Sequence, residues 1–168
     1  MNVFPTRILL ASDGSESAAH ATEVAVELSK KTHSELHVLY VGEYSTASLV
    51  PQAADTSWVV QEDLAPLEEQ GQQFEQVARQ TLDAEVQQVR AAGGTIAQAH
   101  LRLGTPAAEI VELAEDLKVG LVVVGSRGLG GIRRALMGSV SDSVVRHARC
   151  LVLVVRKEEE PAQVASGT

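Results

Sequence analysis

The sequence predicts an α/β fold built on a parallel sheet, and three observations lead to this prediction. Hydrophobic residues make up 45% of the chain and aromatic residues only 3%, so the core is expected to be aliphatic. Residues 121–124 form an uninterrupted apolar run, which is typical of a strand buried on both faces. Residues 7–41 show the pattern strand, helix, strand, a unit whose two strands are parallel.

The first strand and helix follow from apolar spacing. Residues 7–12 form a short apolar run that ends at Asp13, Gly14 and Ser15, which are turn residues. A helix is then predicted as far as about Lys31, because small and aliphatic residues recur at helical spacing (Ala18, Ala21, Ala25 and Leu28). The second strand is predicted over residues 35–41.

Residues 43–70 interrupt this alternation of strands and helices. The segment contains Pro51, Trp58 and Pro66 and has no sustained period, although residues 64–69 can join the next helix. An irregular insertion is therefore predicted after the second strand. Both a cover over a ligand and a disordered excursion fit a loop of this length.

Helices and strands alternate again in the second half of the chain. A helix is marked by apolar residues from Phe74 to Val89 and ends at Gly93 and Gly94, and residues 95–102 alternate as in a half-exposed edge strand. Thr105 and Pro106 supply a cap and a first-turn proline for the next helix. The remaining predicted elements are strands over 120–124 and 150–155 and a helix over 140–148.

Length and charge limit the organisation and the partners. One domain is predicted over residues 1–156, with a solvated tail over 157–168, because 168 residues are too few for two comfortable domains. A net charge of −8 argues against nucleic acid or an anionic membrane as partner. No signal segment or membrane-spanning apolar run is found, and the single cysteine, Cys150, is interpreted as a buried residue, so a cytoplasmic protein is expected.

A glycine-rich loop follows the strand at 120–124. Gly125, Gly128 and Gly138 lie in this loop, and a helix begins after the last of them, capped by Ser139 or Ser141. A helix start offers unbonded N–H groups and a positive dipole end, so this geometry suits a phosphate. An ordinary strand-to-helix turn is the alternative. Five arginines against one acid between residues 125 and 149 favour the anion site (Arg127, Arg133, Arg134, Arg146 and Arg149, with Asp142).

The spacing of the loop resembles that of a known family. Gly125, two residues, Gly128, nine residues, and then Gly138 and Ser139 are similar to the signature of the ATP-binding branch of the universal stress protein family. Neither a P-loop nor a G-x-G-x-x-G motif after the first strand is present. Further similar landmarks lie at Asp13 to Ser15, at Val41 and at residues 104–107, so the resemblance covers essentially the whole domain.

The resemblance implies a fold and a binding site. It implies a Rossmann-like fold of the adenine nucleotide alpha hydrolase type, an open five-stranded parallel sheet in the order 3-2-1-4-5 with helices on both faces. Ligands bind such sheets at the carboxyl ends of the strands where the strand order reverses, here after strands one and four. By resemblance, Ser12 and Asp13 face the nucleoside, the Val41 backbone meets adenine, and the other contacts surround the ribose and phosphates (Gly125, Ser126, Arg127, Gly128, Gly138, Ser139, Val140 and Ser141).

Two principal functions are compatible with these residues. One is a nucleotide-dependent regulatory module that binds ATP, ADP or AMP. Its Mg²⁺ would be bound by the phosphates of the nucleotide, and its protein partner is unknown. The other is a slow ATPase or transferase that uses Mg²⁺ with Ser139 or Ser141 nearby. No histidine is expected to be catalytic, and no acid–lysine pair for phosphoryl transfer is found, so efficient hydrolysis is not expected. A nucleotide-free stress protein is disfavoured by the intact glycine signature. A homodimer is expected through the apolar edge strand over 150–155.

Overall fold

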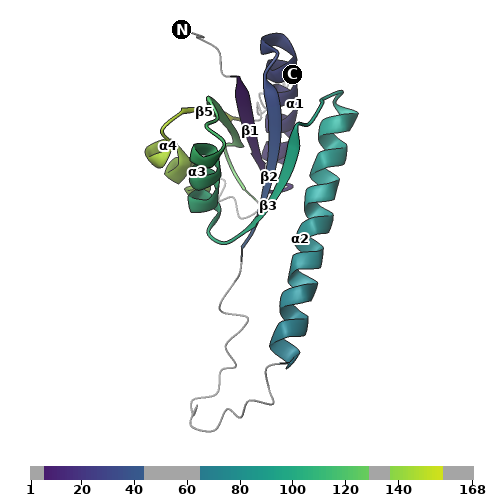
Figure 1. The fold of residues 1–168 in the computed structure, drawn as a ribbon. Coiled ribbons are helices and arrows are strands. Elements are labelled where there is room, and N and C mark those ends of the chain that lie inside the picture. The colour runs from purple at the N-terminus through teal and green to yellow at the C-terminus, as the bar shows by residue number, and fades with distance from the viewer. Residues whose placement is uncertain (1–5, 44–64, 129–136, 157–168) are drawn as a thin grey trace, which may run out of the picture.

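The computed structural model describes residues 6–43, 65–128 and 137–156, in which helices and strands alternate along the chain (Figure 1). The strands are β1 (Arg7–Ser12), β2 (Glu35–Gly42), β3 (Gln98–Leu103), β4 (Leu121–Gly125) and β5 (Leu151–Val155), and the helices are α1 (Glu16–Thr32), α2 (Ala65–Ala91), α3 (Pro106–Asp116) and α4 (Ser139–His147). Each helix and strand predicted from the sequence is found.

The five strands form one sheet in the order β3-β2-β1-β4-β5, and each neighbouring pair is parallel. The chain builds outward from β1 through β2 to β3 and then crosses back to β4 beside β1. This reversal of direction brings the carboxyl ends of β1 and β4 together. The order confirms the fold that the family resemblance implies.

Most bounds agree with the prediction to within about one residue, and the starts of α2 and β3 differ by more. Helix α2 begins at Ala65, so the last residues of the segment predicted to be irregular are helical, while residues 44–64 and the tail at 157–168 lie outside the described residues. Strand β3 begins at Gln98 because the residues before it complete the end of α2. There, Gly93 adopts a φ of +79° and the Gly94 amide donates to the Val89 carbonyl at 2.9 Å.

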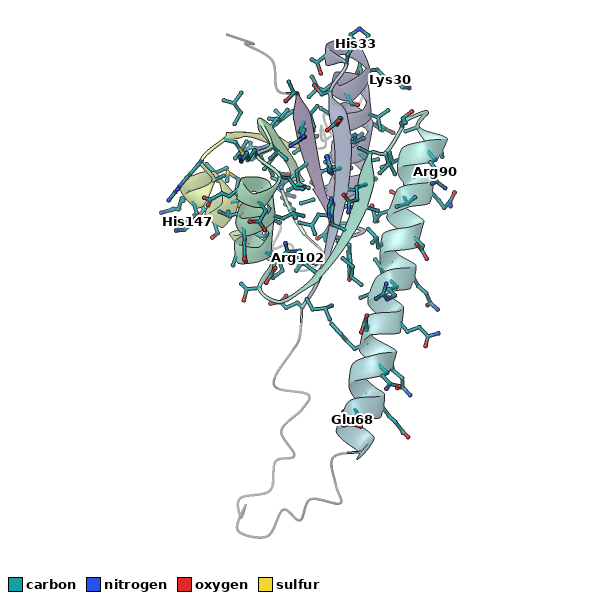
Figure 2. All side chains as sticks on the ribbon, viewed as in Figure 1. Lys30, His33, Glu68, Arg90, Arg102 and His147 are labelled. Atoms are coloured by element: carbon teal, nitrogen blue, oxygen red, sulfur yellow. The ribbon has the colours of Figure 1, made fainter. Side chains whose placement is uncertain are left out.

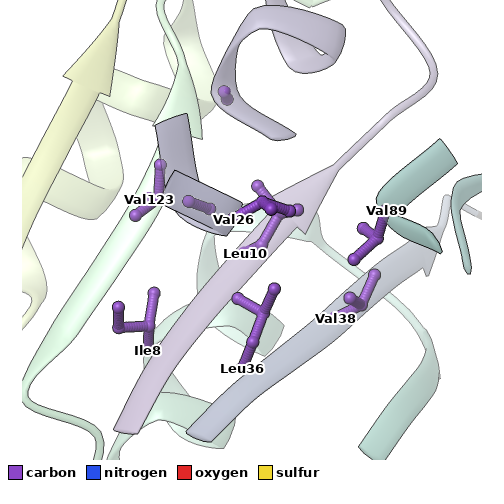
Figure 3. Close-up of a cluster of buried hydrophobic side chains, with 9 residues drawn as sticks. Ile8, Leu10, Val26, Leu36, Val38, Val89 and Val123 are labelled. Atoms are coloured by element: carbon purple, nitrogen blue, oxygen red, sulfur yellow. The ribbon is translucent and has the colours of Figure 1, made fainter. Parts of the chain in front are cut away.

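The face of the sheet that α1 and α2 cover holds the first part of the core. Alternate residues of β1 and β2, including Leu10 and Val38, are fully buried there and pack with Val26 of α1, Val89 of α2 and Val123 of β4 (Figure 3). Alternation follows from the strand period of two residues, which sends every second side chain to the same face.

The opposite face packs against α3 and α4. Leu9, Leu39 and Val122 point to this side and meet Ile110 of α3 and Val144 of α4. Because the inner strands are buried on both faces, their sequences are apolar without alternation, as the run in β4 predicted.

Helix α2 is longer than the sheet beside it. It runs next to β3 and extends past the carboxyl edge of the sheet (Figure 1), and Figure 2 places Glu68 at the extended end and Arg90 near the other end. In the part of the chain that the structure covers, no helix is both long and apolar enough to cross a membrane.

Candidate functional site

A cavity of about 600 Å³ lies at the carboxyl ends of β1, β2 and β4. All four helices that the structure describes contribute residues to its walls. The lining residues are Ala11, Ser12 and Asp13 of β1 and its turn, Leu39, Tyr40, Val41 and Glu43 at β2, Ala18 of α1, Phe74, Val77 and Ala78 of α2, Pro106 and Ile110 of α3, Val124, Gly125, Arg127 and Gly128 at β4, and Met137, Gly138, Ser139, Val140 and Ser141 at α4.

All but one of the residues predicted for the site line this cavity. The exception is Ser126, which is only 4% exposed and lies behind the wall. Its carbonyl accepts hydrogen bonds from the Gly138 amide at 2.7 Å and from the Ser141 hydroxyl at 3.2 Å. Ser126 therefore joins the two ends of the glycine loop.

The turn after β1 is held by its own side chains. Asp13 Oδ1 accepts from the Ser15 amide at 3.0 Å, and the Ser15 hydroxyl caps α1 by accepting from the Ala18 amide at 3.1 Å. Ser15 Oγ also lies 3.2 Å from the Arg127 carbonyl, to which it donates. Asp13 thus has the turn role that its place after the first strand predicted, and it also lines the cavity.

Two glycines of the loop lie in close contacts with the residues that follow β1. A Cβ at Gly125 would lie 2.8 Å from the Ser17 carbonyl carbon of α1, and a Cβ at Gly128 would lie 2.6 Å from Asp13 Oδ2. Gly125 lets the end of β4 contact the start of α1, and Gly128 lies against the turn after β1. Part of the glycine spacing therefore serves packing between elements.

The start of α4 differs from the prediction in its cap. Gly138 is the N-cap, with φ −75° and ψ 162°, and Ser139 is the first residue of the helix. The Ser141 hydroxyl donates to the Gly138 carbonyl at 3.0 Å as well as to Ser126, so neither serine caps the helix. Because glycine has no side chain, it offers no acceptor to the first amides of α4, and this helix start faces the cavity.

A buried carboxyl group lies behind the turn of β1. Glu85 of α2 is 2% exposed, and its Oε2 accepts a 2.5 Å hydrogen bond from the Ser12 hydroxyl. Burial raises the pKa of Glu85, the Ser12 hydrogen bond opposes that shift, and the nearby Asp13 charge adds to it. The sequence analysis missed Glu85, because a glutamate on a helix is normally exposed.

A model of the universal stress protein family matches residues 5–156. The chain belongs to the universal stress protein family. A universal stress protein of Methanocaldococcus jannaschii is 32% identical over 92% of this chain and 84% of its own length. Among solved structures, universal stress protein UspA from Lactobacillus plantarum superposes with a TM-score of 0.69 at 25% identity, covering 90% of this chain and 97% of that one. A universal stress protein in complex with cAMP gives 0.58 at 26%, covering 90% and 96%.

The arginines of this universal stress protein contribute less to the cavity than their number in the sequence indicates. Arg127 lines it, whereas Arg146 pairs with Asp142 at 2.9 Å and Arg149 with Glu115 at 3.3 Å. Arg133 and Arg134 lie outside the described residues. Three of the five arginines lie in the described residues, and of these Arg127 alone lines the cavity. The other two form ion pairs with acids on the surface of α3 and α4.

The histidines of the described segments do not line the cavity. His37 and His100 stack within the sheet with ring centroids 5.4 Å apart, and His37 Nδ1 lies 3.1 Å from His100 Nε2. Burial lowers the pKa of both rings. Within residues 6–43, 65–128 and 137–156, no cluster of three or more His, Cys, Asp or Glu side chains could hold a metal ion.

Sequence analysis also missed the walls that α2 and α3 supply. In the sequence, Phe74, Val77 and Ala78 show only helical spacing, and Pro106 and Ile110 indicate only the next helix. Val77 is 60% exposed although it belongs to that apolar pattern. Periodicity identifies the apolar face of a helix, but it does not distinguish a face that packs in the core from one that lines a cavity.

Proposed function

We propose that this universal stress protein binds an adenine nucleotide, with ATP as the full ligand, and acts as a nucleotide-dependent regulatory module in the cytoplasm. The observation that carries this proposal is that Asp13, Val41 and the glycine loop, identified separately along the chain, all line one cavity. A solved universal stress protein similar to this chain is described in complex with cAMP, which supports an adenine nucleotide as the ligand.

The start of α4 is suited to the phosphates. Gly138 and Ser139 lie at the cavity wall, where the first amides of the helix and the positive end of its dipole favour an anion. Arg127 lines the same cavity and adds a positive charge. The phosphates of the nucleotide would therefore lie between the glycine loop and α4.

The walls by β1, β2 and α3 are suited to the nucleoside. The Asp13 carboxylate would repel phosphates but can accept hydrogen bonds from ribose hydroxyls. Leu39, Pro106 and Ile110 supply apolar surface beside Val41, as a purine ring requires. The volume of about 600 Å³ falls within the usual range for small-molecule sites.

A regulatory role has more support than catalysis. No histidine or lysine is found among the cavity residues that the structure describes, so a histidine base and a phosphate-binding lysine are not evident there. The Ser141 hydroxyl is engaged by two backbone carbonyls, which disfavours it as a nucleophile. The alternative is a slow ATPase or nucleotide-dependent transferase that uses Mg²⁺ bound by the phosphates of the nucleotide.

The proposal is tested by two measurements on purified protein. Denaturation followed by mass spectrometry of the released small molecules should yield an adenine nucleotide, and calorimetric titration should show binding of ATP. Absence of binding to ATP, ADP, AMP and cAMP would contradict the proposal. Turnover at saturating ATP and Mg²⁺ near the enzyme median of about 10 per second would favour the alternative.

A further inference from the structure

Glu85 lies where the packing of the core alone does not explain a carboxyl group. It belongs to the face of α2 that also buries Ala78 and Val89, and it is 2% exposed. An ionised side chain is costly to bury, and its raised pKa reflects that cost. A leucine would fill such a position without this cost, so the carboxyl group is expected to have a specific task.

The contacts of Glu85 lead to the turn after β1. Its Oε2 accepts from the Ser12 hydroxyl at 2.5 Å, and its Oε1 would lie 3.6 Å from a Cβ at Gly14. The Ser12 hydroxyl in turn accepts a long hydrogen bond, 3.5 Å, from the Gly14 amide. Glu85 therefore reaches the peptide that follows Asp13 through one intermediate side chain.

The geometry of that turn determines where Asp13 lies. Gly14 has a φ of +77°, and Asp13 Oδ1 is held by the Ser15 amide at 3.0 Å, which leaves Oδ2 beside Gly128 at the cavity. A turn with positive φ is easily altered when its hydrogen bonds are lost. Support on the Ser12 side is therefore needed to keep the carboxylate directed at the ligand.

We propose that Glu85 is a positioning residue for the nucleoside end of the site, acting through Ser12 on the turn that carries Asp13. This inference rests on the proposed nucleotide-binding function. Helix α2 would then act on the ligand in two ways. Glu85 acts through Ser12, and Phe74, Val77 and Ala78 of the same helix line the cavity. Ligand binding and the packing of α2 on the sheet therefore favour each other, because coupling between two sites is reciprocal.

Calorimetric titration of variants with ATP and adenosine tests the proposal. Glu85→Leu removes the acceptor for Ser12 and should weaken both ligands by about tenfold or more, since a hydrogen bond to a charged group is lost. Glu85→Gln keeps an acceptor oxygen and should restore affinity to within about threefold of the parent. The matched control is Glu75→Gln on the same helix, whose carboxylate pairs with Arg79 at 2.6 Å, and it should bind as the parent does.

A double variant separates positioning from a general structural effect. In an Asp13→Ala background, Glu85→Leu should weaken binding by less than about twofold further, because the group that it positions is already absent. Full additivity, parent affinity in Glu85→Leu, or an equal loss in Glu85→Gln and Glu85→Leu would each overturn the proposal.

A second variant keeps the test decisive if Glu85→Leu does not fold. Ser12→Ala breaks the same hydrogen bond and leaves α2 unchanged, so parent affinity in Ser12→Ala would also overturn the inference. If the parent protein itself binds neither ATP nor adenosine, the proposed function is wrong and this inference falls with it, whereas a binding parent with unaffected variants contradicts the inference alone.

Discussion

Asp13 and Gly128 meet across the point where the strand order reverses. The Asp13 carboxylate follows β1 and Gly128 follows β4, and a Cβ built on Gly128 would lie 2.6 Å from Asp13 Oδ2. Real Cβ atoms do not approach an oxygen so closely. A side chain at residue 128 would therefore have to displace the Asp13 carboxylate, whose other oxygen, Oδ1, accepts from the Ser15 amide.

Gly128→Ala should displace the Asp13 carboxylate and weaken ATP and adenosine alike, by about tenfold, because one hydrogen bond to a charged group is lost. Calorimetric titration measures both affinities. The matched control is Gly71→Ala, where nothing lies within 4 Å of the added Cβ. That control should bind as the parent does and raise the free energy of unfolding by about 0.5–1 kcal/mol, since Gly71 is inside α2. Parent affinity in Gly128→Ala would show that Asp13 does not contact the ligand.

Gly138→Val should abolish ATP binding while the domain stays folded. Gly138 has an ordinary extended backbone with a φ of −75°, so a side chain there causes no backbone strain. A Cβ there would be 3.5 Å from the nearest atoms, which is ordinary contact, so the loss is expected from the phosphate space alone. Circular dichroism checks the fold and calorimetry the binding.

The contrast with Asp13→Ala identifies the two ends of the site. Asp13→Ala should weaken adenosine and ATP together, whereas Gly138→Val should spare adenosine, and Ser139→Ala should have a smaller effect than Gly138→Val on ATP. If Gly138→Val binds ATP as tightly as the parent, the loop from Gly125 to Ser141 is merely a structural turn.

Stability should decrease in mild acid because of His37 and His100. Burial holds both pKa values below the ordinary value, so the folded protein resists protonation that the unfolded chain accepts. Their stabilising contribution is therefore full above about pH 6.5 and is lost as the pH falls from there through the folded-state pKa values. Urea unfolding at several pH values measures this slope.

Replacing both rings tests the origin of that slope. The double variant His37→Phe/His100→Phe should show a flatter dependence of the free energy of unfolding on pH, whatever its absolute stability. Glu85, whose pKa is raised, contributes the opposite sign, with stability lost as the pH rises above about 4.3, and it is common to both proteins. His33→Asn, at the exposed left-handed cap of α1, is the control and should keep the parent slope.

The dimer prediction concerns β5, which is an edge strand of the sheet. Leu153 and Val155 pack against the core, so charges there would disturb the fold as well as an interface. Leu151 is 64% exposed, and Leu151→Glu should therefore shift a dimer toward monomer at micromolar concentration. Val77→Glu, on α2 at the other edge, is the control and should leave the dimer intact. A monomeric parent in light scattering would contradict the prediction.

Much of the fold was predictable because it is local. The period of apolar residues reports which face of each helix or strand is buried, and glycine, proline and serine mark the turns between them. Strand β4 was identifiable from its valines, and α3 from Thr105 and Pro106 at its start. The strand order required the family resemblance, because no local pattern states which strands are neighbours.

The sequence by itself determined the helices and strands, the turn at Asp13 and the glycine spacing of the loop, since each depends on residues close together along the chain. Only the tertiary structure decided that Glu85 is buried against Ser12, that Phe74 and Val77 line the cavity, and that Arg146 and Arg149 pair with acids away from it. These outcomes depend on which surfaces meet when α2 packs on β2 and β3 and α4 packs beside α3. Charge and hydrophobicity in the sequence are compatible with several such contacts, and close packing selects one of them.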